Sequence, residues 1–439
     1  MRPVRFLLSA AILTLGAGAG SAQEITPGAG VDVLSYNVEI APDFQTKSLS
    51  GSERIEFRAL QDDLREVVFS KNALDVTSAE LDGKPVRIER RGNALVFVLP
   101  GALRRGRSAT LRLSYRGQPK RGVTFTDTSV FTSYWACDWM ICSQDAPGDK
   151  ARFELSLRLP AGMGSLSVGR LWSIMAGTDG SRVHLWRESR PYSAYLYGFA
   201  AGHFREARAR QGRAVLSYLS PTASPQEMKA LLSTTEAMVR FLEAKAGLPL
   251  PVRRYTQLLV SGDEAQEAAT YSVIGLKQIE PILSDPGNDW VVVHELAHQW
   301  WGNLVTARNW DHFWLNEGIV TFMTAAWKEH RFGRAAYVAE LDIARRRLAR
   351  LKEAGGDRPL AFAGPYPSLA ARRSVQYSKG ALFLDHLRTQ LGEDSFWNGL
   401  KSFTRTHAGG VVESRDFQRA FEKASGRDLS AMFDEWVYP

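Results

Sequence analysis

Two histidines and a glutamate near the middle of the chain have the types and spacing of a metal-binding site. His294, Glu295 and His298 form the pattern H-E-x-x-H. Residues four apart lie on one face of a helix, so both imidazoles can reach a single ion. Glu295 points about 100° away around the helix axis and is better placed to hold a water molecule than to bind the metal. The pattern therefore predicts a catalytic zinc site with Glu295 as the general base.

A catalytic zinc ion usually has three protein ligands and an open position for water, so another ligand must come from elsewhere in the chain. Glu317 follows His298 after an interval that fits a loop and a returning helix. Residues 302–303, Gly-Asn, suit the end of the first helix, and Asp311 can cap the next one. We expect one Zn2+ per chain, held by His294, His298 and Glu317.

The sequence around these residues resembles the aminopeptidase N and leukotriene hydrolase family of gluzincin metallopeptidases. Residues 294–306, HELAHQWWGNLVT, and residues 314–318, WLNEG, carry the resemblance. Residues 142–147, CSQDAP, resemble the family segment that ends in Asp-Glu-Pro, and the likeness extends over nearly all of residues 30–439. The chain stops where the catalytic domain of that family ends. The resemblance therefore implies a short form without the C-terminal helical domain and with a more open cleft.

The resemblance also implies an oxyanion donor. Residues 375–380, VQYSKG, resemble the tyrosine motif of the family. By that match Tyr377 donates its hydroxyl to the oxyanion on the scissile carbonyl, a contact commonly worth about 2.7–4 kcal/mol in the transition state. Glu295 would take a proton from the attacking water and pass it to the leaving amine. We therefore expect peptide-bond hydrolysis, with peptides as substrates.

Substrate recognition is where the sequence departs from the family. A G-x-M-E-N segment of the family holds the substrate amine through its Glu, and counting back from His294 puts Thr270 at that position. A neutral hydroxyl cannot replace the charge-assisted hydrogen bond of a carboxylate to an ammonium group. The candidate substrate-binding residues are Thr270, Glu267, Glu264, Asp138 and Gln144. Release of N-terminal residues is the leading interpretation. The alternatives are a peptidase that needs no free N-terminus and a zinc-containing binding protein without turnover.

Two sequence patterns divide the chain. Residues 32–118 alternate apolar and polar positions between turn signals such as Asp82-Gly83, and strand-like runs continue to about residue 205. Helical spacing then dominates, over residues 225–246, 288–301, 313–331, 335–353, 375–392 and 415–424. We predict an α+β protein with an N-terminal antiparallel β domain, residues 23–205, and a mostly α-helical domain with a small sheet, residues 206–439. The resemblance implies a saddle-like shape for the first domain and a thermolysin-like catalytic fold for the second.

The first residues of the chain indicate export. Arg2 and Arg5 precede an apolar run, residues 6–15, and small residues then lead to Ala22. This is the pattern of a secretory signal peptide, residues 1–22, so we expect a periplasmic or extracellular protein after cleavage near Ala22. No later apolar run reaches the roughly 18 residues that suggest a transmembrane helix.

Composition and charge argue against other classes of protein. Hydrophobic residues make up 44% of the chain and charged residues 23%, which is a globular balance. The net charge of +8 is spread along the chain, and its densest run, residues 345–350, fits a solvated helix face. Nothing therefore indicates a nucleic-acid partner, and the oligomeric state stays open.

The two cysteines lie close together in the first domain. Cys137 and Cys142 can form a disulfide in an exported protein, with free thiols as the alternative. Several large side chains surround them, and these fit either a substrate pocket or a core: Tyr134, Trp135, Trp139 and Met140.

Overall fold

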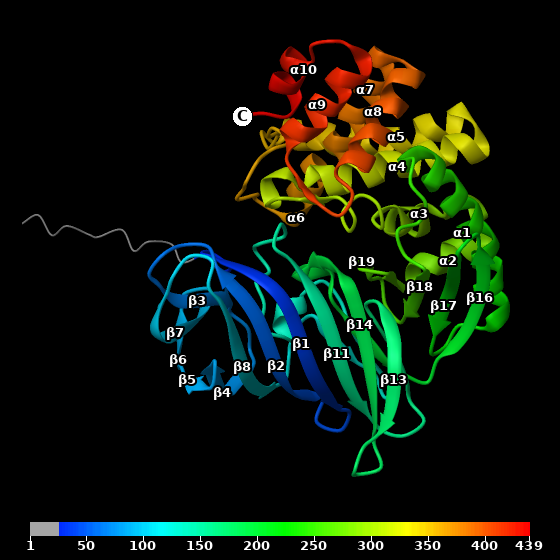
Figure 1. The fold of residues 1–439 in the computed structure, drawn as a ribbon. Helices are drawn as coiled ribbons and strands as arrows, with labels where there is room; N and C mark the ends of the chain where they lie inside the picture. Colours follow the sequence, from blue (N-terminus) through cyan, green and yellow to red (C-terminus); the bar gives the residue numbers. More distant parts are fainter. Residues whose placement is uncertain (1–25) are drawn as a thin grey trace, which may run out of the picture.

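The computed structural model describes residues 26–439, and the expected signal peptide, residues 1–22, lies outside them. Figure 1 shows a curved layer of strands from the first half of the chain, coloured blue to green. The helices of the second half, coloured green to red, gather beside it. The predicted α+β fold is therefore confirmed.

An eight-stranded sheet forms the main layer of the first half. In spatial order its strands are β13 (Arg170–Ala176), β14 (Arg182–Ser193), β11 (Lys150–Leu159), β1 (Val31–Asp43), β2 (Ser48–Ala59), β8 (Ser108–Gly117), β4 (Asp75–Leu81) and β5 (Lys84–Pro85). Asp82 and Gly83 join the last two strands, with φ values of 46° and 81° that suit a tight hairpin. The prediction of a purely antiparallel domain is wrong at one place, because β1 pairs with β11 in parallel. Parallel neighbours need a long crossover, and residues 44–149 provide it.

Two smaller sheets complete this half. One contains β3 (Leu64–Ser70), β7 (Ala94–Leu103) and β6 (Arg87–Arg91). The other contains β12 (Gly164–Ser167), β15 (Phe199–Gly202), β10 (Ser129–Thr132) and β9 (Val123–Phe125).

A five-stranded sheet begins the second half, and its strands are β16 (Arg205–Gln211), β17 (Ala214–Ser220), β18 (Arg254–Val260), β20 (Tyr271–Gly275) and β19 (Ala265–Ala268). Strand β19 lies at the edge and pairs antiparallel with β20. Alternate residues of β18 face opposite ways: Leu259 packs with the helices, whereas Leu258 and Val260 pack with the strands of the first half. This sheet therefore lies where the two parts meet, and residue 205 remains our proposed domain boundary.

The helices are α1 (Pro225–Ala246), α2 (Leu276–Ser284), α3 (Trp290–Ala297), α4 (Trp314–Phe332), α5 (Arg334–Glu353), α6 (Leu369–Arg373), α7 (Gly380–Leu391), α8 (Glu393–Thr406), α9 (Ser414–Ser425) and α10 (Ser430–Trp436). Within residues 26–439, none of them is long and apolar enough to cross a membrane.

Two helix predictions need correction. Asp311 does not cap α4, because it lies in a short 3-10 turn, Trp310–His312, and α4 begins at Trp314. The single helix expected over residues 375–392 is divided into a π-helical segment, Ser374–Lys379, and α7. Such π segments are rare and are frequent at functional sites.

Candidate active site

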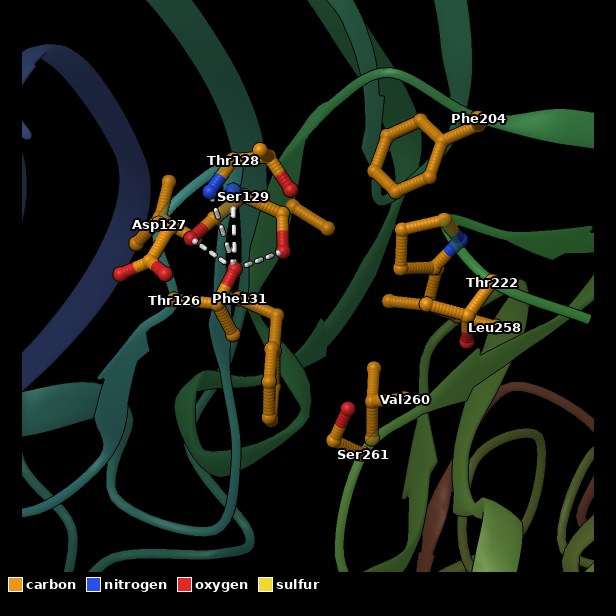
Figure 2. A pocket seen from close by; sticks show the side chains of 13 residues that line it. Thr126, Asp127, Thr128, Ser129, Phe131, Phe204, Thr222, Leu258, Val260 and Ser261 are labelled. Carbon is orange, nitrogen blue, oxygen red and sulfur yellow. Dashed lines mark hydrogen bonds between the residues drawn. The ribbon is translucent and has the colours of Figure 1, made fainter.

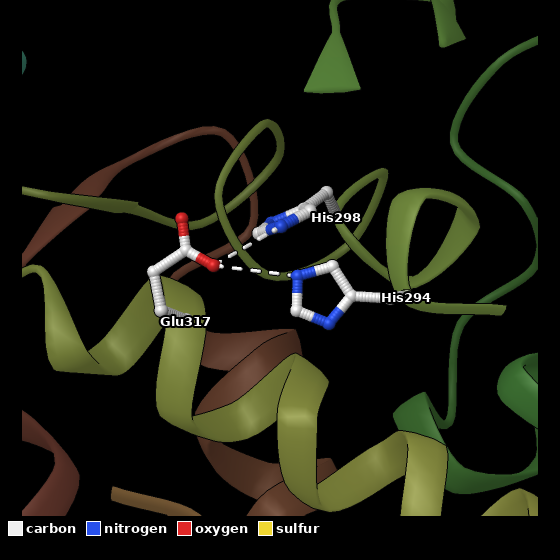
Figure 3. A group of neighbouring side chains, drawn as sticks. All are labelled: His294, His298 and Glu317. Carbon is white, nitrogen blue, oxygen red and sulfur yellow. Dashed lines mark ion pairs between the residues drawn. The ribbon is translucent and has the colours of Figure 1, made fainter. Parts of the chain in front are cut away.

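Helices α3 and α4 bring the three predicted metal ligands together, as Figure 3 shows. His294 lies in α3, His298 follows its last residue, and Glu317 lies in the first turn of α4. The Oε2 atom of Glu317 is 3.4 Å from His294 Nε2 and 3.5 Å from His298 Nε2. Ligand atoms about 2.0–2.1 Å from a tetrahedral zinc ion lie about 3.3–3.4 Å apart. The three donor atoms therefore have the spacing of a zinc site.

The loop after α3 fixes the orientation of His298. Its Nδ1 lies 3.0 Å from the carbonyl oxygen of Trp301. A carbonyl only accepts, so Nδ1 carries a proton, and Nε2, which faces Glu317, is the nitrogen that can bind a metal. Gly302 makes the chain turn possible beside this ring: its φ is +126°, and a Cβ there would lie 3.0 Å from His298 Nδ1.

Three buried carboxylates surround His298. Suitable donor atoms of Glu267, Glu295 and His298 lie within 4.8 Å of one another, beside the His294, His298 and Glu317 group. Within residues 26–439, the two imidazoles are the only ion-pair partners of Glu317. One oxygen each of Glu295 and Glu317 is buried without a hydrogen-bond partner. Buried carboxylates are costly without a positive partner, so this donor set fits a divalent cation.

The pKa shifts follow from burial and from this concentration of negative charge. Burial raises the pKa of Glu295 well above its usual value and the pKa of Glu267 to about 7, although His298 opposes both shifts. Burial disfavours the charged form of His298, but Glu267 and Glu317 outweigh it and raise its pKa to about 10. Burial also opposes ionisation of Glu317, yet His298 and His294 hold its pKa below the usual range. The site therefore favours a bound positive charge.

The π-helical segment places Tyr377 over the metal ligands. Its ring is parallel to that of His294, with 6.0 Å between the centroids. Burial and the charges of Glu317 and Glu267 raise the pKa of Tyr377 well above its usual value, so its hydroxyl stays protonated and can donate. An oxyanion donor requires this form.

Two glycines set the distance between Tyr377 and Glu317. Gly318 of α4 follows Glu317, and Gly380 begins α7 one turn after Tyr377. A Cβ on Gly380 would lie 2.8 Å from Gly318 Cα, and a Cβ on Gly318 would lie 2.9 Å from Gly380 Cα. The two helices therefore cross at a contact that only glycine permits.

The structure separates the candidate substrate-binding residues. Thr270 has a φ of +73°, and its hydroxyl accepts a hydrogen bond from Gly169 N, 2.9 Å away. Its side chain is therefore engaged outside the metal group. Of the three acidic candidates, Glu267 lies in the metal-site grouping, whereas Asp138 is paired with Arg121. Glu264 precedes β19 and is not part of that grouping.

Gln144 and the two cysteines hold together the loop that follows Tyr134. A disulfide joins Cys137 to Cys142. Gln144 Nε2 donates to Tyr134 O, and its Oε1 accepts from Cys137 N. Trp139 and Met140 are fully buried and belong to the core, whereas Tyr134 and Trp135 are each 41% exposed. The core interpretation is therefore confirmed for Trp139 and Met140, and the pocket interpretation stays an untested prediction for Tyr134 and Trp135.

Lys150 is a positioning residue that sequence reasoning missed. Its ammonium group reaches four backbone carbonyls, at 3.1–3.4 Å, from two loops of the second half: those of Asn303, Leu304, Gly409 and Gly410. Asn303 N in turn donates to His298 O, and its side chain donates to Ala268 O. Burial lowers the pKa of Lys150 to about 7, whereas the four acceptors favour its protonated form. A lone lysine in a strand gives no sequence signal of this role.

A separate cavity of about 250 Å³ lies between β10 and β18. Figure 2 shows the side chains that line it. Its polar side is a turn in which Thr126 Oγ1 lies 2.7 Å from Ser129 Oγ, and its apolar side includes Phe131, Phe204 and Val260. None of its lining residues belongs to the metal group. We assign it no chemistry.

Comparison with known proteins agrees with this site. The sequence model of the Peptidase family M1 domain matches residues 268–436, and that of the Peptidase M1 N-terminal domain matches residues 33–196. The chain belongs to the peptidase M1 family. The two matched M1 domains cover most strands of the first half and the helices that carry the metal ligands.

Curated M1 relatives are about twice as long as this chain. "Probable aminopeptidase 1" of Saccharolobus solfataricus is 25% identical over 91% of this chain and 52% of its own length. "Aminopeptidase 2" of Candida albicans is 23% identical over 94% of this chain and 48% of its own length. The chain therefore spans about half the length of the curated relatives it matches.

Solved structures share the M1 fold over nearly their whole length. A mutant M1 zinc metallopeptidase of Deinococcus radiodurans, bound to a Tyr-Ser-Ala substrate, superposes with a TM-score of 0.76. It is 23% identical and is matched over 94% of this chain and 95% of its own. At this identity the likeness shows a common two-part fold.

Proposed function

We propose that the chain is a zinc-dependent aminopeptidase that hydrolyses the first peptide bond of a peptide with a free N-terminus. The observation that carries this proposal is the grouping of Glu267 and Glu295 around His298, beside the metal ligands. The grouping supplies a carboxylate for proton transfer and a second carboxylate for an ammonium group. The aminopeptidase names of the relatives support the same class of reaction.

Each residue has a defined task in this reaction. A zinc ion at the site would supply Lewis acidity, which polarises a carbonyl and makes water nucleophilic near neutral pH. Glu295 accepts the proton of the attacking water at its carboxylate and transfers it to the nitrogen of the leaving amine. Tyr377 donates its hydroxyl hydrogen to the carbonyl oxygen as negative charge develops there. Trp301 holds the His298 ring so that Nε2 faces the metal position.

Glu267 favours an aminopeptidase over a peptidase that needs no free N-terminus. Its side chain is buried beside Glu295 and His298, and a buried carboxylate needs a cationic or hydrogen-bonding partner. The ammonium group of a peptide provides a charge-assisted hydrogen bond, and an acetylated N-terminus does not. We therefore assign amine binding to Glu267. Counting back from His294 had instead placed Thr270 at the position of the amine-binding residue.

The test compares one fluorogenic peptide in two forms, with a free and with an acetylated N-terminus. The intact chain should cleave the free form and leave the acetylated form nearly untouched. Glu267→Gln should lower kcat/KM for the free form about 10- to 100-fold, the range of a lost charge-assisted hydrogen bond of about 1.5–3 kcal/mol. Glu264→Gln removes a neighbouring carboxylate outside the metal group and serves as the matched control. Equal cleavage of both forms would exclude amine anchoring.

Two further variants test the catalytic tasks. Glu295→Gln should keep its zinc content and lose nearly all turnover, because the amide cannot accept the proton. Tyr377→Phe should keep its zinc and lower kcat by about 100- to 1,000-fold, as expected for a lost oxyanion donor. Full activity of the first variant would remove Glu295 as the base. A normal zinc content without turnover of any peptide by the unaltered chain would favour a binding protein.

We also propose that the protein is exported. The signal-peptide pattern of residues 1–22 supports export, and a disulfide between Cys137 and Cys142 suits an oxidising compartment. N-terminal sequencing of the mature protein should give a chain that starts close to residue 23. An intact Met1 would contradict export by this route.

A further inference from the structure

Strand β19 offers an open sheet edge beside the metal group. Gly275 N donates to Glu264 O, 2.7 Å away, so the main chain of Glu264 faces β20. Antiparallel neighbours alternate, and the main-chain groups of Ala265 and Glu267 therefore face away from β20. Outward groups on an edge strand can pair with an extended peptide. A substrate lying along β19 would meet Glu267 and Ala265 in turn.

Such a peptide can run in only one direction from Glu267. The end of β19 at Ala268 is closed, because Ala268 O accepts hydrogen bonds from the side-chain amides of Gln299 and Asn303. The next amide, Ala269 N, donates to Leu196 O. With the ammonium group at Glu267, the residues after the scissile bond must therefore extend toward Ala265.

The Tyr134 hydroxyl occupies both main-chain hydrogen-bonding groups of Ala265. It donates to Ala265 O, 2.7 Å away, and accepts from Ala265 N, 2.9 Å away. These are the two hydrogen bonds that the backbone of a paired peptide residue would make. Burial raises the pKa of Tyr134 to about 12, and the charges of Glu295, Glu267 and Glu264 act in the same direction, so its hydroxyl stays protonated and can donate to Ala265 O.

Contacts from both halves of the chain hold Tyr134 in this position. Tyr134 N donates to Gln266 Oε1, 2.6 Å away, and Tyr134 O accepts from Gln144 Nε2, 3.2 Å away. Its φ of +59° is uncommon for a bulky residue and persists only where surrounding contacts impose it. The disulfide between Cys137 and Cys142 closes the loop that follows. Tyr134 is therefore held firmly against the edge of β19.

We propose that Tyr134 is a specificity-determining residue. Its hydroxyl takes the place of the substrate backbone at Ala265. It thereby limits the binding free energy that the residues after the scissile bond can contribute. This inference rests on the proposed aminopeptidase function. A peptide must displace the Tyr134 hydroxyl to pair at Ala265, so added length brings little affinity. The unaltered chain then prefers substrates by their first residue and discriminates weakly by length.

The experiment compares alanine 4-nitroanilide, which has no peptide backbone after the scissile bond, with tetra-alanine. Tyr134→Phe keeps the ring and removes the hydroxyl, and Tyr134→Gly removes the ring at a φ that glycine adopts freely. Both variants should raise kcat/KM for tetra-alanine about 5- to 20-fold through a lower KM, because two main-chain groups of Ala265 become available. Both should change kcat/KM for the anilide by less than about 2-fold. Trp135→Phe is the control, because Trp135 is equally exposed but stacks on Arg121, 4.2 Å away.

Calorimetry on the Glu295→Gln variant separates this inference from the proposed function. In that background Tyr134→Phe should tighten tetra-alanine binding by the same factor without turnover. Equal changes for both substrates, or weaker tetra-alanine binding, would overturn the role of Tyr134. If the unaltered chain hydrolyses neither substrate, the proposed function fails, and the calorimetric comparison still decides whether Tyr134 competes for the β19 edge.

Discussion

The glycine crossing between α4 and α7 gives the sharpest prediction for the position of Tyr377. In Gly380→Ala the added Cβ would lie 2.8 Å from Gly318 Cα. Carbon atoms in ordinary contact are about 3.5–4.0 Å apart, so the helices must separate by about 1 Å. Overpacking of this kind commonly costs about 1–3 kcal/mol of the free energy of unfolding.

The same displacement acts on the proposed catalytic groups. Tyr377 lies one turn before Gly380, and Glu317 lies next to Gly318. A misplacement of about 1 Å can cost about 100-fold in rate, so we expect kcat of Gly380→Ala to fall about 10- to 100-fold, with weaker zinc binding. Peptide kinetics, urea unfolding and zinc competition with a chelator measure the three effects. Gly318→Ala should have similar effects. The double variant should lose less free energy of unfolding than the two single variants together, because one separation of the helices accommodates both methyl groups.

Gly101→Ala is the matched control, because a Cβ at Gly101 has no heavy atom within 4 Å. It should leave both kcat and the free energy of unfolding close to those of the unaltered chain. A Gly380→Ala variant with unaltered kcat, zinc affinity and unfolding would refute the reasoning. A variant that loses stability and keeps full turnover would retain the tight crossing but remove its effect on Tyr377.

Three further predictions concern the junction and the metal. Lys150→Met should lower the free energy of unfolding by about 2–4 kcal/mol and weaken zinc binding, because four carbonyls lose their donor, two of them in the buried residues Asn303 and Leu304. Lys71→Met, which removes a single exposed hydrogen bond to Gly92 O, is the control. Burial raises the pKa of Asp149 to about 7, above an unfolded value of about 3.9. The stabilising contribution of Asp149 is thus complete below about pH 4 and is lost as the pH rises through 7. The free energy of unfolding of the unaltered chain should therefore decline by about 2–4 kcal/mol across this range, and that of Asp149→Asn should not. Removing zinc with a chelator should abolish turnover and lower the melting temperature, and added zinc should restore both.

Each of these has a result that contradicts it. Equal destabilisation of the Lys150 and Lys71 variants would remove the special role of the junction lysine. Parallel stability curves for the unaltered chain and the Asp149 variant would show that this carboxyl titrates normally. An unchanged melting temperature after chelation would mean that the site does not bind zinc in the folded protein.

The sequence by itself determined the local parts of this protein. The i, i+4 spacing of His294 and His298 depends only on helix geometry, and the structure places both beside Glu317. Alternating and helical patterns predicted the two halves for the same reason, since each period belongs to one kind of element. The segment around Tyr377 was also located, although its π-helical form was not.

Only the tertiary structure decided which residues share the site. Counting along the chain pointed to Thr270, but β19 turns Glu267 toward the metal group and directs the Thr270 hydroxyl to Gly169. Tyr134 and Lys150 reach the second half from strands and loops far away in sequence. Spacing specifies which way a side chain points within one element, whereas contacts between elements depend on the packing of whole sheets and helices. The metal ligands follow from the geometry of one helix and a nearby one, so the sequence could predict them. The residues that we propose to meet the substrate depend on packing between distant elements, so the sequence could not.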